Sequence, residues 1–292
     1  MADSAELLPT PSSNRLSDIL NQARQRLSVS DSISPSASLD AQVLLAEVLQ
    51  VNRAHLLAHP ERLLTPDEIT RYEIMIARRE QGEPVAYILG RKPFYDREMI
   101  VTPAVLIPRP ETELLLEWAL EIARNHPVKT VVDVGTGSGA LAVTFAALMS
   151  DCQVYAVDLS PAALAVARQN ATRQQANITF LEGDLLQPLI DRQLKVDLVL
   201  ANLPYITRDE VTALEVSRYE PVMALDGGSD GLDLVRRLLE QASAACQPQA
   251  NLLLEIGADQ GAAMRNLGRE FALCEIRHDY AGLDRMVRLQ LR

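Results

Sequence analysis

Apolar residues recur at helical spacing along the first part of the chain, in three stretches separated by polar loops. In the first two stretches the apolar positions are Leu16, Ile19, Leu20, Ala23 and Leu27, and then Leu39, Val43, Leu44, Ala46 and Leu49. The third begins near Pro66, where Thr65 can cap a helix and Asp67 and Glu68 lie in its first turn. The pattern predicts a small helical domain over residues 1–82. About the first 14 of these residues show no periodicity and are expected to form a tail.

The pattern changes between residues 83 and 110, which are rich in proline, glycine, aromatic and β-branched residues. Short runs around Phe94 and Val101 are typical of a β-hairpin. We expect this segment to be a hairpin connector between the helical domain and a second domain over residues 111–292.

From Thr130 onward, short apolar runs of strand length alternate with longer helical stretches. The runs cover residues 130–134, 153–157, 178–181, 196–201 and 251–256. This alternation is typical of βαβ units and predicts an α/β fold with a mainly parallel sheet. Two last runs, 274–278 and 285–291, are separated by a turn at Gly282 and are expected to pair antiparallel at the edge of the sheet.

The charge balance argues against nucleic acid partners. The chain has 292 residues, with 28 Lys and Arg against 39 Asp and Glu, which gives a net charge of −11. An acidic chain repels phosphate backbones, and its longest basic groupings are pairs such as Arg78 with Arg79.

The longest mainly apolar stretch, residues 140–149, is about half as long as a membrane-spanning helix, and the polar N-terminus lacks the pattern of a signal peptide. We therefore expect a cytoplasmic protein.

The sequence predicts no metal site and no redox chemistry. The three cysteines, Cys152, Cys246 and Cys274, lie far apart without paired spacing and are interpreted as small core residues. His55 and His59 lie four positions apart, but no glutamate base stands between them.

A glycine-rich loop follows the first of the strand-like runs. Its glycines, Gly135, Gly137 and Gly139, alternate with Thr136 and Ser138, and an apolar helical stretch begins directly after them. Glycines allow a tight turn and the close approach of a ligand, while the start of the next helix offers unpaired N–H groups to an anion. The loop therefore predicts a cofactor site. Its spacing is one residue shorter than the dinucleotide pattern, so a nicotinamide enzyme fits less well, and a plain strand-to-helix turn is the alternative.

Two acidic residues follow the next two strand-like runs. Asp158 lies 23 residues after Gly135, close to where nucleoside-binding folds place an acid on the ribose hydroxyls. Its alternative role is to cap, together with Ser160, the helix that opens at Pro161. Asp184 follows the next run and is expected to accept a hydrogen bond from an adenine amine, with a simple turn residue as the alternative.

The fourth run ends in Asn202, Leu203, Pro204 and Tyr205. A turn after a strand would by itself explain Asn and Pro. The same residues suit chemistry on an amide nitrogen, which is a weak nucleophile because its lone pair is delocalised into the carbonyl group. The Asn202 side-chain oxygen and the Leu203 carbonyl oxygen can accept the two amide N–H groups, and Tyr205 can stack on the planar amide and fix its orientation.

Taken together, the motifs resemble those of the release-factor glutamine methyltransferases, the PrmC/HemK family of class I methyltransferases. The matching segments are 78–87 (RREQGEPVAY), 106–113 (LIPRPETE), 133–139 (DVGTGSG), 158–161 (DLSP), 202–205 (NLPY), Glu220 with Pro221, Asp230 with Gly231, and 255–257. The resemblance implies a Rossmann-like domain with a mainly parallel seven-stranded sheet, S-adenosylmethionine as cofactor, and methylation of the glutamine in the Gly-Gly-Gln motif of peptide chain release factors. It also implies that the helical domain helps to hold the release factor, and we expect a monomer.

The resemblance assigns the cofactor to residues 135–139, Asp158, Asp184, Leu185 and Asn202, and the chemistry to residues 202–205. Two positions depart from the family pattern: members normally read Asn-Pro-Pro-Tyr where this chain has Leu203, and many carry Trp at the position of Leu185. Because the next residue is still proline, which favours an extended backbone at Leu203, we expect the carbonyl direction and the activity to persist. Leu185 leaves an apolar, non-aromatic contact for adenine.

Three other functions are alternatives. A glutamine methyltransferase acting on a ribosomal protein shares the fold and the turn, although segment 106–113 favours the release-factor type. An adenine-N6 methyltransferase of DNA or RNA uses a similar turn but needs a basic groove that the acidic sequence does not indicate. A non-catalytic cofactor-binding adaptor is the alternative that Leu203 suggests.

Overall fold

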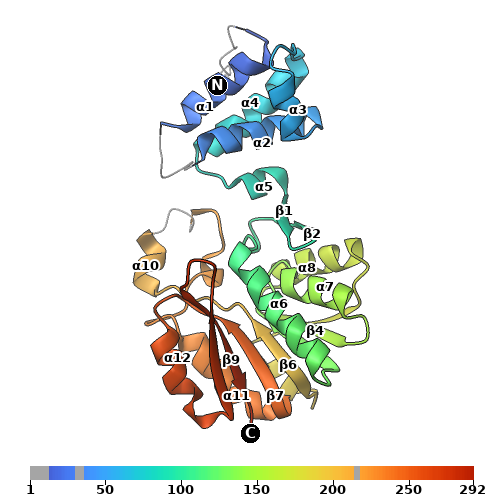
Figure 1. Cartoon of the computed structure of the whole chain (residues 1–292), viewed down its shortest axis with the longest axis vertical. Coiled ribbons are helices and arrows are strands. Elements are labelled where there is room, and N and C mark those ends of the chain that lie inside the picture. The colour runs from blue at the N-terminus through green and yellow to red at the C-terminus, as the bar shows by residue number, and fades with distance from the viewer. Residues whose placement is uncertain (1–12, 30–35, 214–217) are drawn as a thin grey trace, which may run out of the picture. The chain divides into compact units, whose positions relative to one another are not determined.

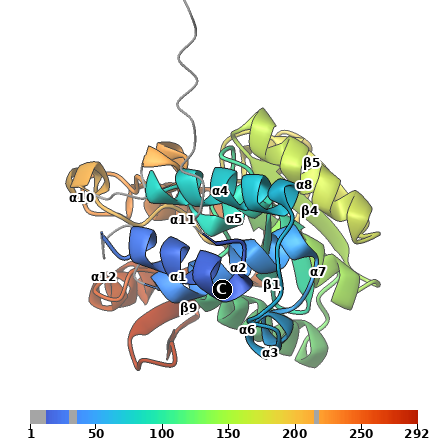
Figure 2. The ribbon, with the colours of Figure 1, turned by 90° about the horizontal axis from the view of Figure 1, so that it is seen from above.

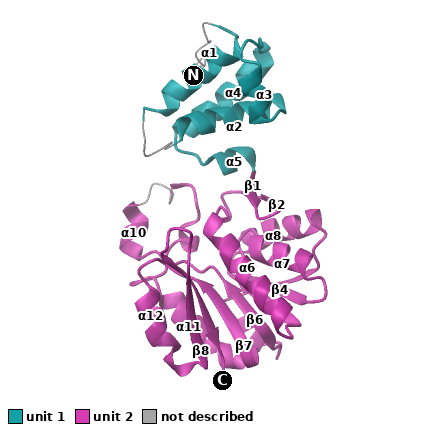
Figure 3. Cartoon of the chain, viewed as in Figure 1, with its two compact units in different colours: residues 1–90 teal, residues 91–292 magenta. Residues whose placement is uncertain are grey.

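The computed structural model describes residues 13–29, 36–213 and 218–292, and the chain divides into two compact units, residues 1–90 and 91–292 (Figure 3). The predicted N-terminal tail lies outside the described residues, apart from Ser13 and Asn14. Among the described residues, no helix combines the length and the apolar character needed to cross a membrane.

Unit 1 is built from helices (Figure 1), namely α1 (Leu16–Leu27), α2 (Ala37–Leu49), α3 (Arg53–Ala58), α4 (Pro66–Glu80) and α5 (Val85–Leu89). The helices α1, α2 and α4 confirm the three predicted from the apolar period, and they share one core that includes Leu44, Tyr72 and Ile76. The predicted cap of α4 is present: the Thr65 hydroxyl accepts from the Glu68 backbone N–H at 3.2 Å, and the Glu68 carboxylate accepts from the Thr65 N–H at 2.8 Å.

Unit 2 contains a seven-stranded sheet with the order β5-β4-β3-β6-β7-β9-β8. Figure 1 labels β4, β6, β7 and β9 of this sheet. Its strands are β3 (Thr130–Val134), β4 (Gln153–Asp158), β5 (Ile178–Glu182), β6 (Val196–Ala201), β7 (Cys246–Glu255), β8 (Leu273–His278) and β9 (Asp284–Gln290). The neighbours from β5 to β7 pair in parallel, whereas β9 lies antiparallel to both β7 and β8. The α/β class, the mainly parallel sheet and the antiparallel edge pair are thus confirmed.

Helices cover both faces of this sheet, which explains why its strands read as continuous apolar runs. One layer contains α6 (Pro110–Asn125), α7 (Ala140–Leu148) and α8 (Pro161–Arg173). The other contains α9 (Gln187–Ile190), α11 (Asp233–Ala245) and α12 (Gly261–Leu267). In β3, Val131 packs into the first layer and Val132 into the second, as the alternation of a strand requires. Unit 2 also contains α10 (Arg208–Ala213; Figure 2) and the 3₁₀ turns η2 (Val222–Ala224) and η3 (Gly268–Glu270).

A hairpin stands within the segment predicted as a connector, and its strands β1 (Arg91–Phe94) and β2 (Arg97–Ile100) pair antiparallel. The division between the units falls after Gly90, so the hairpin belongs to unit 2. Asn170 of α8 anchors it: the side chain accepts from the Ile100 N–H at 2.7 Å and donates to the carbonyl oxygens of Ile100 at 3.0 Å and Ser138 at 2.8 Å. The hairpin is therefore tied to the glycine-rich loop.

Candidate active site

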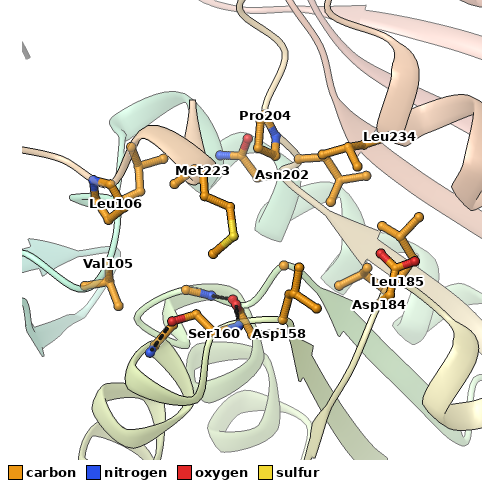
Figure 4. Close-up of a pocket in the computed structure, with 18 of the residues that line it drawn as sticks. Val105, Leu106, Asp158, Ser160, Asp184, Leu185, Asn202, Pro204, Met223 and Leu234 are labelled. Carbon is orange, nitrogen blue, oxygen red and sulfur yellow. Dashed lines mark hydrogen bonds between the residues drawn. The ribbon is translucent and has the colours of Figure 1, made fainter. Parts of the chain in front are cut away.

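A pocket lies at the carboxyl ends of β3, β4, β5 and β6, the edge at which open α/β sheets bind ligands (Figure 4). Of the predicted site residues, the structure brings together here Gly135, Gly137, Asp158, Asp184, Leu185, Asn202, Leu203 and Pro204. The other predicted residues, Thr136, Ser138, Gly139 and Tyr205, are not among the residues that line this cavity. Tyr205 instead lines a second, smaller pocket, which shares Leu106, Asn202, Leu203, Pro204 and Ala224 with the first.

The glycine-rich loop adopts a conformation that glycine takes more readily than any other residue. Gly135, Gly137 and Gly139 have φ values of 70°, 55° and 82°, all in the left-handed region. A Cβ at Gly135 would lie only 3.2 Å from Cδ2 of Leu203, so a side chain there would press on the neighbouring turn. Gly135 and Gly137 also line the pocket, so a ligand there meets loop backbone that carries no side chain.

A buried carboxylate holds this loop in place. Asp133 is 2% exposed and accepts through Oδ2 from the Thr136 hydroxyl at 2.6 Å and from the Ala142 backbone N–H at 3.2 Å. Burial raises the pKa of Asp133 to about 6, although these hydrogen bonds favour its ionised form. Thr136 thus positions the loop relative to the start of α7.

Asp158 joins the end of β4 to the glycine-rich loop. Its Oδ2 accepts from the Gly137 N–H at 2.8 Å, and its Oδ1 accepts from the Ser160 N–H at 2.8 Å (Figure 4). Burial raises the pKa of Asp158, and the same backbone hydrogen bonds oppose the rise. The cap of α8 is the Ser160 hydroxyl, which accepts from the Ala163 N–H at 3.2 Å. A carboxylate has about four acceptor positions, so Asp158 keeps capacity to accept from a ligand in the pocket.

Asp184 and Leu185 form another wall of the pocket. The Asp184 carboxylate pairs with the guanidinium of Arg237 on α11, a lining residue that the sequence did not indicate. Leu185 is 6% exposed and has a φ of 51°, a left-handed conformation that is unusual for leucine. Packing of the Leu185 side chain in the apolar cluster on that face of the sheet stabilises this left-handed conformation.

Apolar side chains complete the pocket. Val105, Leu106, Met223 and Leu234 line it, and Figure 4 shows the Met223 side chain directed into the cavity. Leu106 belongs to the matching segment 106–113, which is the signal that could have identified it. Met223 and Leu234 stand in no motif and were missed.

The turn at residues 202–205 faces both pockets. Asn202 Nδ2 donates to the Thr112 hydroxyl oxygen at 2.9 Å, which fixes the side-chain amide. No residue that the structure describes donates to Asn202 Oδ1 or to the Leu203 carbonyl oxygen. Both oxygens therefore keep their capacity to accept from a ligand. Burial raises the pKa of the Tyr205 hydroxyl, so its side chain stays neutral at physiological pH.

Gln260 donates hydrogen bonds that support this turn, and two glycines leave room for its backbone. Gln260 Nε2 donates to the carbonyl oxygens of Tyr205 and Gly231 at 3.1 Å and 3.2 Å. A Cβ at Gly231 would lie 2.2 Å from the Tyr205 carbonyl oxygen, and one at Gly227 would lie 2.6 Å from that of Pro204. A side chain at either glycine would displace the turn.

An ion pair joins two of the matching segments beside the second pocket. Arg109 Nη2 donates to both carboxylate oxygens of Glu220, at 2.9 Å and 2.8 Å, and the Glu220 side chain is 0% exposed. Burial raises the pKa of Glu220, and the charge of Arg109 opposes the rise. Because Arg109 also lines the second pocket, the pair fixes part of its wall.

The histidine pair of unit 1 has a structural contact. The His55 and His59 rings stack with centroids 4.2 Å apart, and His59 Nδ1 lies 3.0 Å from the His55 carbonyl oxygen. In the part of the chain that the structure describes, no group of three or more His, Cys, Asp or Glu side chains is arranged to hold a metal ion.

Comparison with known proteins identifies both units. Residues 18–90 match the family described as the PrmC N-terminal domain, and residues 131–219 match a methyltransferase domain family. Among solved structures, the Thermus thermophilus 16S rRNA N2 G1207 methyltransferase (RsmC), in complex with AdoMet and guanosine, is similar with a TM-score of 0.51. It is 16% identical and covers 69% of this chain and 50% of its own, which supports the class I methyltransferase fold alone.

Relatives with curated names are more similar and span both units. The release factor glutamine methyltransferase of Koribacter versatilis is 39% identical over 274 residues, covering 93% of this chain and 97% of the relative. That of Moorella thermoacetica is 42% identical over 276 residues, covering 92% of this chain and 96% of the relative. With its fold, its turn at 202–205 and this identity over nearly the full length of both chains, the protein belongs to the family of release factor glutamine methyltransferases.

Proposed function

We propose that the chain transfers a methyl group from S-adenosylmethionine to the side-chain amide nitrogen of the glutamine in the Gly-Gly-Gln motif of a peptide chain release factor. The observation that carries this proposal is the turn at 202–205, where two acceptors, Asn202 Oδ1 and the Leu203 carbonyl oxygen, stand beside two adjoining pockets. The names of the curated relatives support the same substrate.

The larger pocket has the chemistry to hold S-adenosylmethionine. The acceptor capacity that remains on Asp158 suits the ribose hydroxyls, and Asp184 can accept from the adenine amine alongside its pair with Arg237. Leu185 supplies apolar contact for the adenine ring, and the left-handed glycines let the loop approach the ligand. When bound, the cofactor supplies a methyl group on a positively charged sulfur, which is an electrophile for nitrogen.

We assign the smaller pocket to the glutamine side chain. Two acceptors that hold both N–H groups of the amide would keep one face of its nitrogen toward the methyl donor, and such positioning lowers the barrier of a two-reactant step. Tyr205 supplies a ring that can cover the planar amide. As the N–C bond forms, the bond between the methyl group and the sulfur would break and leave its electron pair on the sulfur, and the nitrogen would then lose one proton to solvent.

We assign recognition of the release factor to the helical unit. All residues that line the two pockets lie at position 104 or beyond, so unit 1 contributes none of them. Unit 1 has its own core and matches a domain family named after PrmC. A separate domain outside the chemistry is suited to holding a large protein substrate.

A methyl-transfer assay tests the function. Isotope-labelled S-adenosylmethionine is offered with a purified release factor, with a ribosomal protein mixture and with DNA. We expect label in the release factor alone, at the glutamine of Gly-Gly-Gln by mass spectrometry, and none in a release factor whose glutamine is replaced by alanine. Label in a ribosomal protein or in DNA would reassign the substrate, and cofactor binding without transfer to any of them would favour a non-catalytic adaptor.

A further inference from the structure

A line of three polar side chains runs from the second pocket into the protein interior. Asn202 Nδ2 donates to Thr112 Oγ1 at 2.9 Å, and Thr112 Oγ1 donates to Glu255 Oε2 at 2.7 Å. Thr112, in the first turn of α6, is 5% exposed, and Glu255, at the end of β7, is 2% exposed. Neither Thr112 nor Glu255 lines either pocket, so Thr112 acts on a ligand indirectly, through its hydrogen bond with Asn202, and Glu255 acts through Thr112.

The charge of Glu255 sets the direction of these hydrogen bonds. An ionised carboxylate can only accept, so the Thr112 hydroxyl donates its single proton to Glu255. Thr112 Oγ1 can then only accept from Asn202, and the Asn202 side chain must turn its amino group toward Thr112. Asn202 Oδ1 is left on the side that faces the pockets.

We propose that Thr112 and Glu255 are positioning residues for methyl transfer, which together hold the Asn202 amide in the orientation that presents Oδ1 to the substrate amide. The inference rests on the proposed function, in which Asn202 accepts from the glutamine. An asparagine side chain has two orientations that fill nearly the same space. The reversed orientation would set N–H groups of Asn202 against N–H groups of the glutamine. Thr112 and Glu255 therefore favour the orientation of Asn202 that can bind the glutamine amide.

The groups around Glu255 make its charge responsive near neutral pH. Burial raises the pKa of Glu255 to about 7 and the charge of Glu111 on α6 adds to the rise, whereas Thr112, Arg285 and Tyr205 favour the ionised form. Among the described residues, Glu255 Oε1 has no hydrogen-bond partner. The carboxylate thus depends on few contacts to stay ionised.

Protonation of Glu255 reverses the direction of the hydrogen bonds that join it to Thr112 and Thr112 to Asn202. A neutral carboxyl group can donate to Thr112, whose hydroxyl is then able to donate to Asn202 Oδ1. Asn202 can turn over and present Nδ2 to the pocket. Because the pKa of Glu255 is raised to about 7, methyl transfer should fall as the pH drops below that value, with the uptake of one proton.

Substitution of Thr112 tests the proposal. Thr112→Val keeps the shape of the side chain and removes the hydroxyl, so kcat with the release factor should fall by about tenfold or more, while cofactor affinity should change by less than about twofold. Thr112→Ser keeps the hydroxyl and should restore most of the lost kcat. The matched control is Thr144→Val, at a threonine that is 0% exposed and whose hydroxyl has no hydrogen-bond partner among the described residues. This control should leave kcat unchanged.

The pH profile separates positioning from a merely structural role. In wild type, kcat should decline below about pH 7, as the pKa of Glu255 requires. In Thr112→Val the hydroxyl that links Glu255 to Asn202 is missing, so the ionisation of Glu255 no longer affects the orientation of Asn202. In Glu255→Gln the side chain no longer titrates. Both variants should therefore have a low kcat that does not decline further on the acid side. Combining both substitutions should cost little more than the slower single one. Loss of packing alone would lower kcat and leave the decline in place.

The outcomes distinguish this proposal from the function on which it rests. A wild-type protein that methylates no glutamine would overturn the proposed function, and the positioning role with it. An active wild type that is matched by Thr112→Val and Glu255→Gln at every pH would overturn the positioning role alone. If Thr112→Val fails to fold, as judged by its melting curve, the same comparison of Glu255→Gln with wild type decides the question.

Discussion

Asp158 links structure and ligand binding in one carboxylate, because each of its oxygens already accepts a backbone N–H, from Gly137 or from Ser160. Sequence spacing predicted the place of Asp158 at a strand end. The hydrogen bond to Gly137 could not be predicted, because it depends on the loop conformation after β3 and on the pairing of β3 with β4. A substitution here should therefore affect the loop as well as the ligand.

Asp158→Ala should weaken the binding of S-adenosylmethionine by about 1 to 3 kcal/mol, because the ribose hydroxyls would lose their acceptor and the loop would lose a backbone partner. Titration calorimetry measures the change. Thr65→Ala, which removes a helix cap in unit 1, serves as the control with unaltered affinity. A folded Asp158→Ala variant that binds as well as wild type would refute the ribose assignment.

Asn202→Ala removes one of the two acceptors proposed for the glutamine amide. Methyl transfer should fall by roughly a hundredfold or more, as when a preorganised polar group is lost from an active site. Cofactor affinity should change far less, because Asp158 and the glycine-rich loop remain. Single-turnover rates with saturating cofactor measure this effect, and retained activity would remove the turn from the mechanism.

Leu203 departs from the family pattern, and the structure gives its side chain a packing role. It is 5% exposed, belongs to an apolar core cluster and lies against Gly135. Leu203→Pro keeps the carbonyl group, and Pro204 already restricts the backbone at 203, so the rate should change by less than about tenfold. The melting temperature should fall because buried contacts are lost. If only the Leu203→Pro variant were active, the wild-type protein would instead be a non-catalytic cofactor-binding adaptor.

At the scale of elements, the buried parallel strands were the most predictable parts. Strands β3 and β6 have the bounds that the apolar runs predicted, because both faces of each strand are covered. Strand β7 begins at Cys246, earlier than the predicted residue 251, because its exposed residues 247–249 carry no apolar signal. Helices α3 and α5 are six and five residues long and show no period, so they were not predicted.

Asn170→Ala tests how α8 holds the hairpin and the glycine-rich loop together. Asn170 is 0% exposed, and its loss would leave the Ile100 N–H and the carbonyl oxygens of Ile100 and Ser138 without these partners. The free energy of unfolding should fall by about 2 to 4 kcal/mol in urea titrations. The control Asn266→Ala, at an exposed position of α12, should stay within about 0.5 kcal/mol of wild type. Equal losses in both variants would contradict the anchoring role.

At the scale of the whole molecule, the candidate site is assembled from segments far apart along the chain. Thr112 lies 90 residues from Asn202 and 143 from Glu255, yet hydrogen bonds join the three. Motifs predicted which residues gather at the strand ends, because the carboxyl ends of parallel strands share one edge. The contacts of Thr112 and Arg237 depend on how α6 and α11 pack on the sheet, which no local pattern specifies.

The separate cores of the two units allow their roles to be tested by deletion. The cluster that includes Leu44 and Tyr72 lies wholly within unit 1, while the clusters on both faces of the sheet and both pockets lie within unit 2. A chain of residues 91–292 should therefore fold, by circular dichroism, and bind S-adenosylmethionine with nearly the affinity of the full chain.

If unit 1 holds the release factor, the KM of that shortened chain for intact release factor should rise by about tenfold or more, since each 1.4 kcal/mol of lost binding costs about a factor of ten. A short peptide that contains Gly-Gly-Gln has no fold for unit 1 to hold, so both chains should methylate it at equal rates. An unchanged KM for the intact protein would exclude unit 1 from substrate binding. Weak cofactor binding by a folded 91–292 chain would instead mean that unit 1 stabilises the pocket indirectly, because none of its residues lines it.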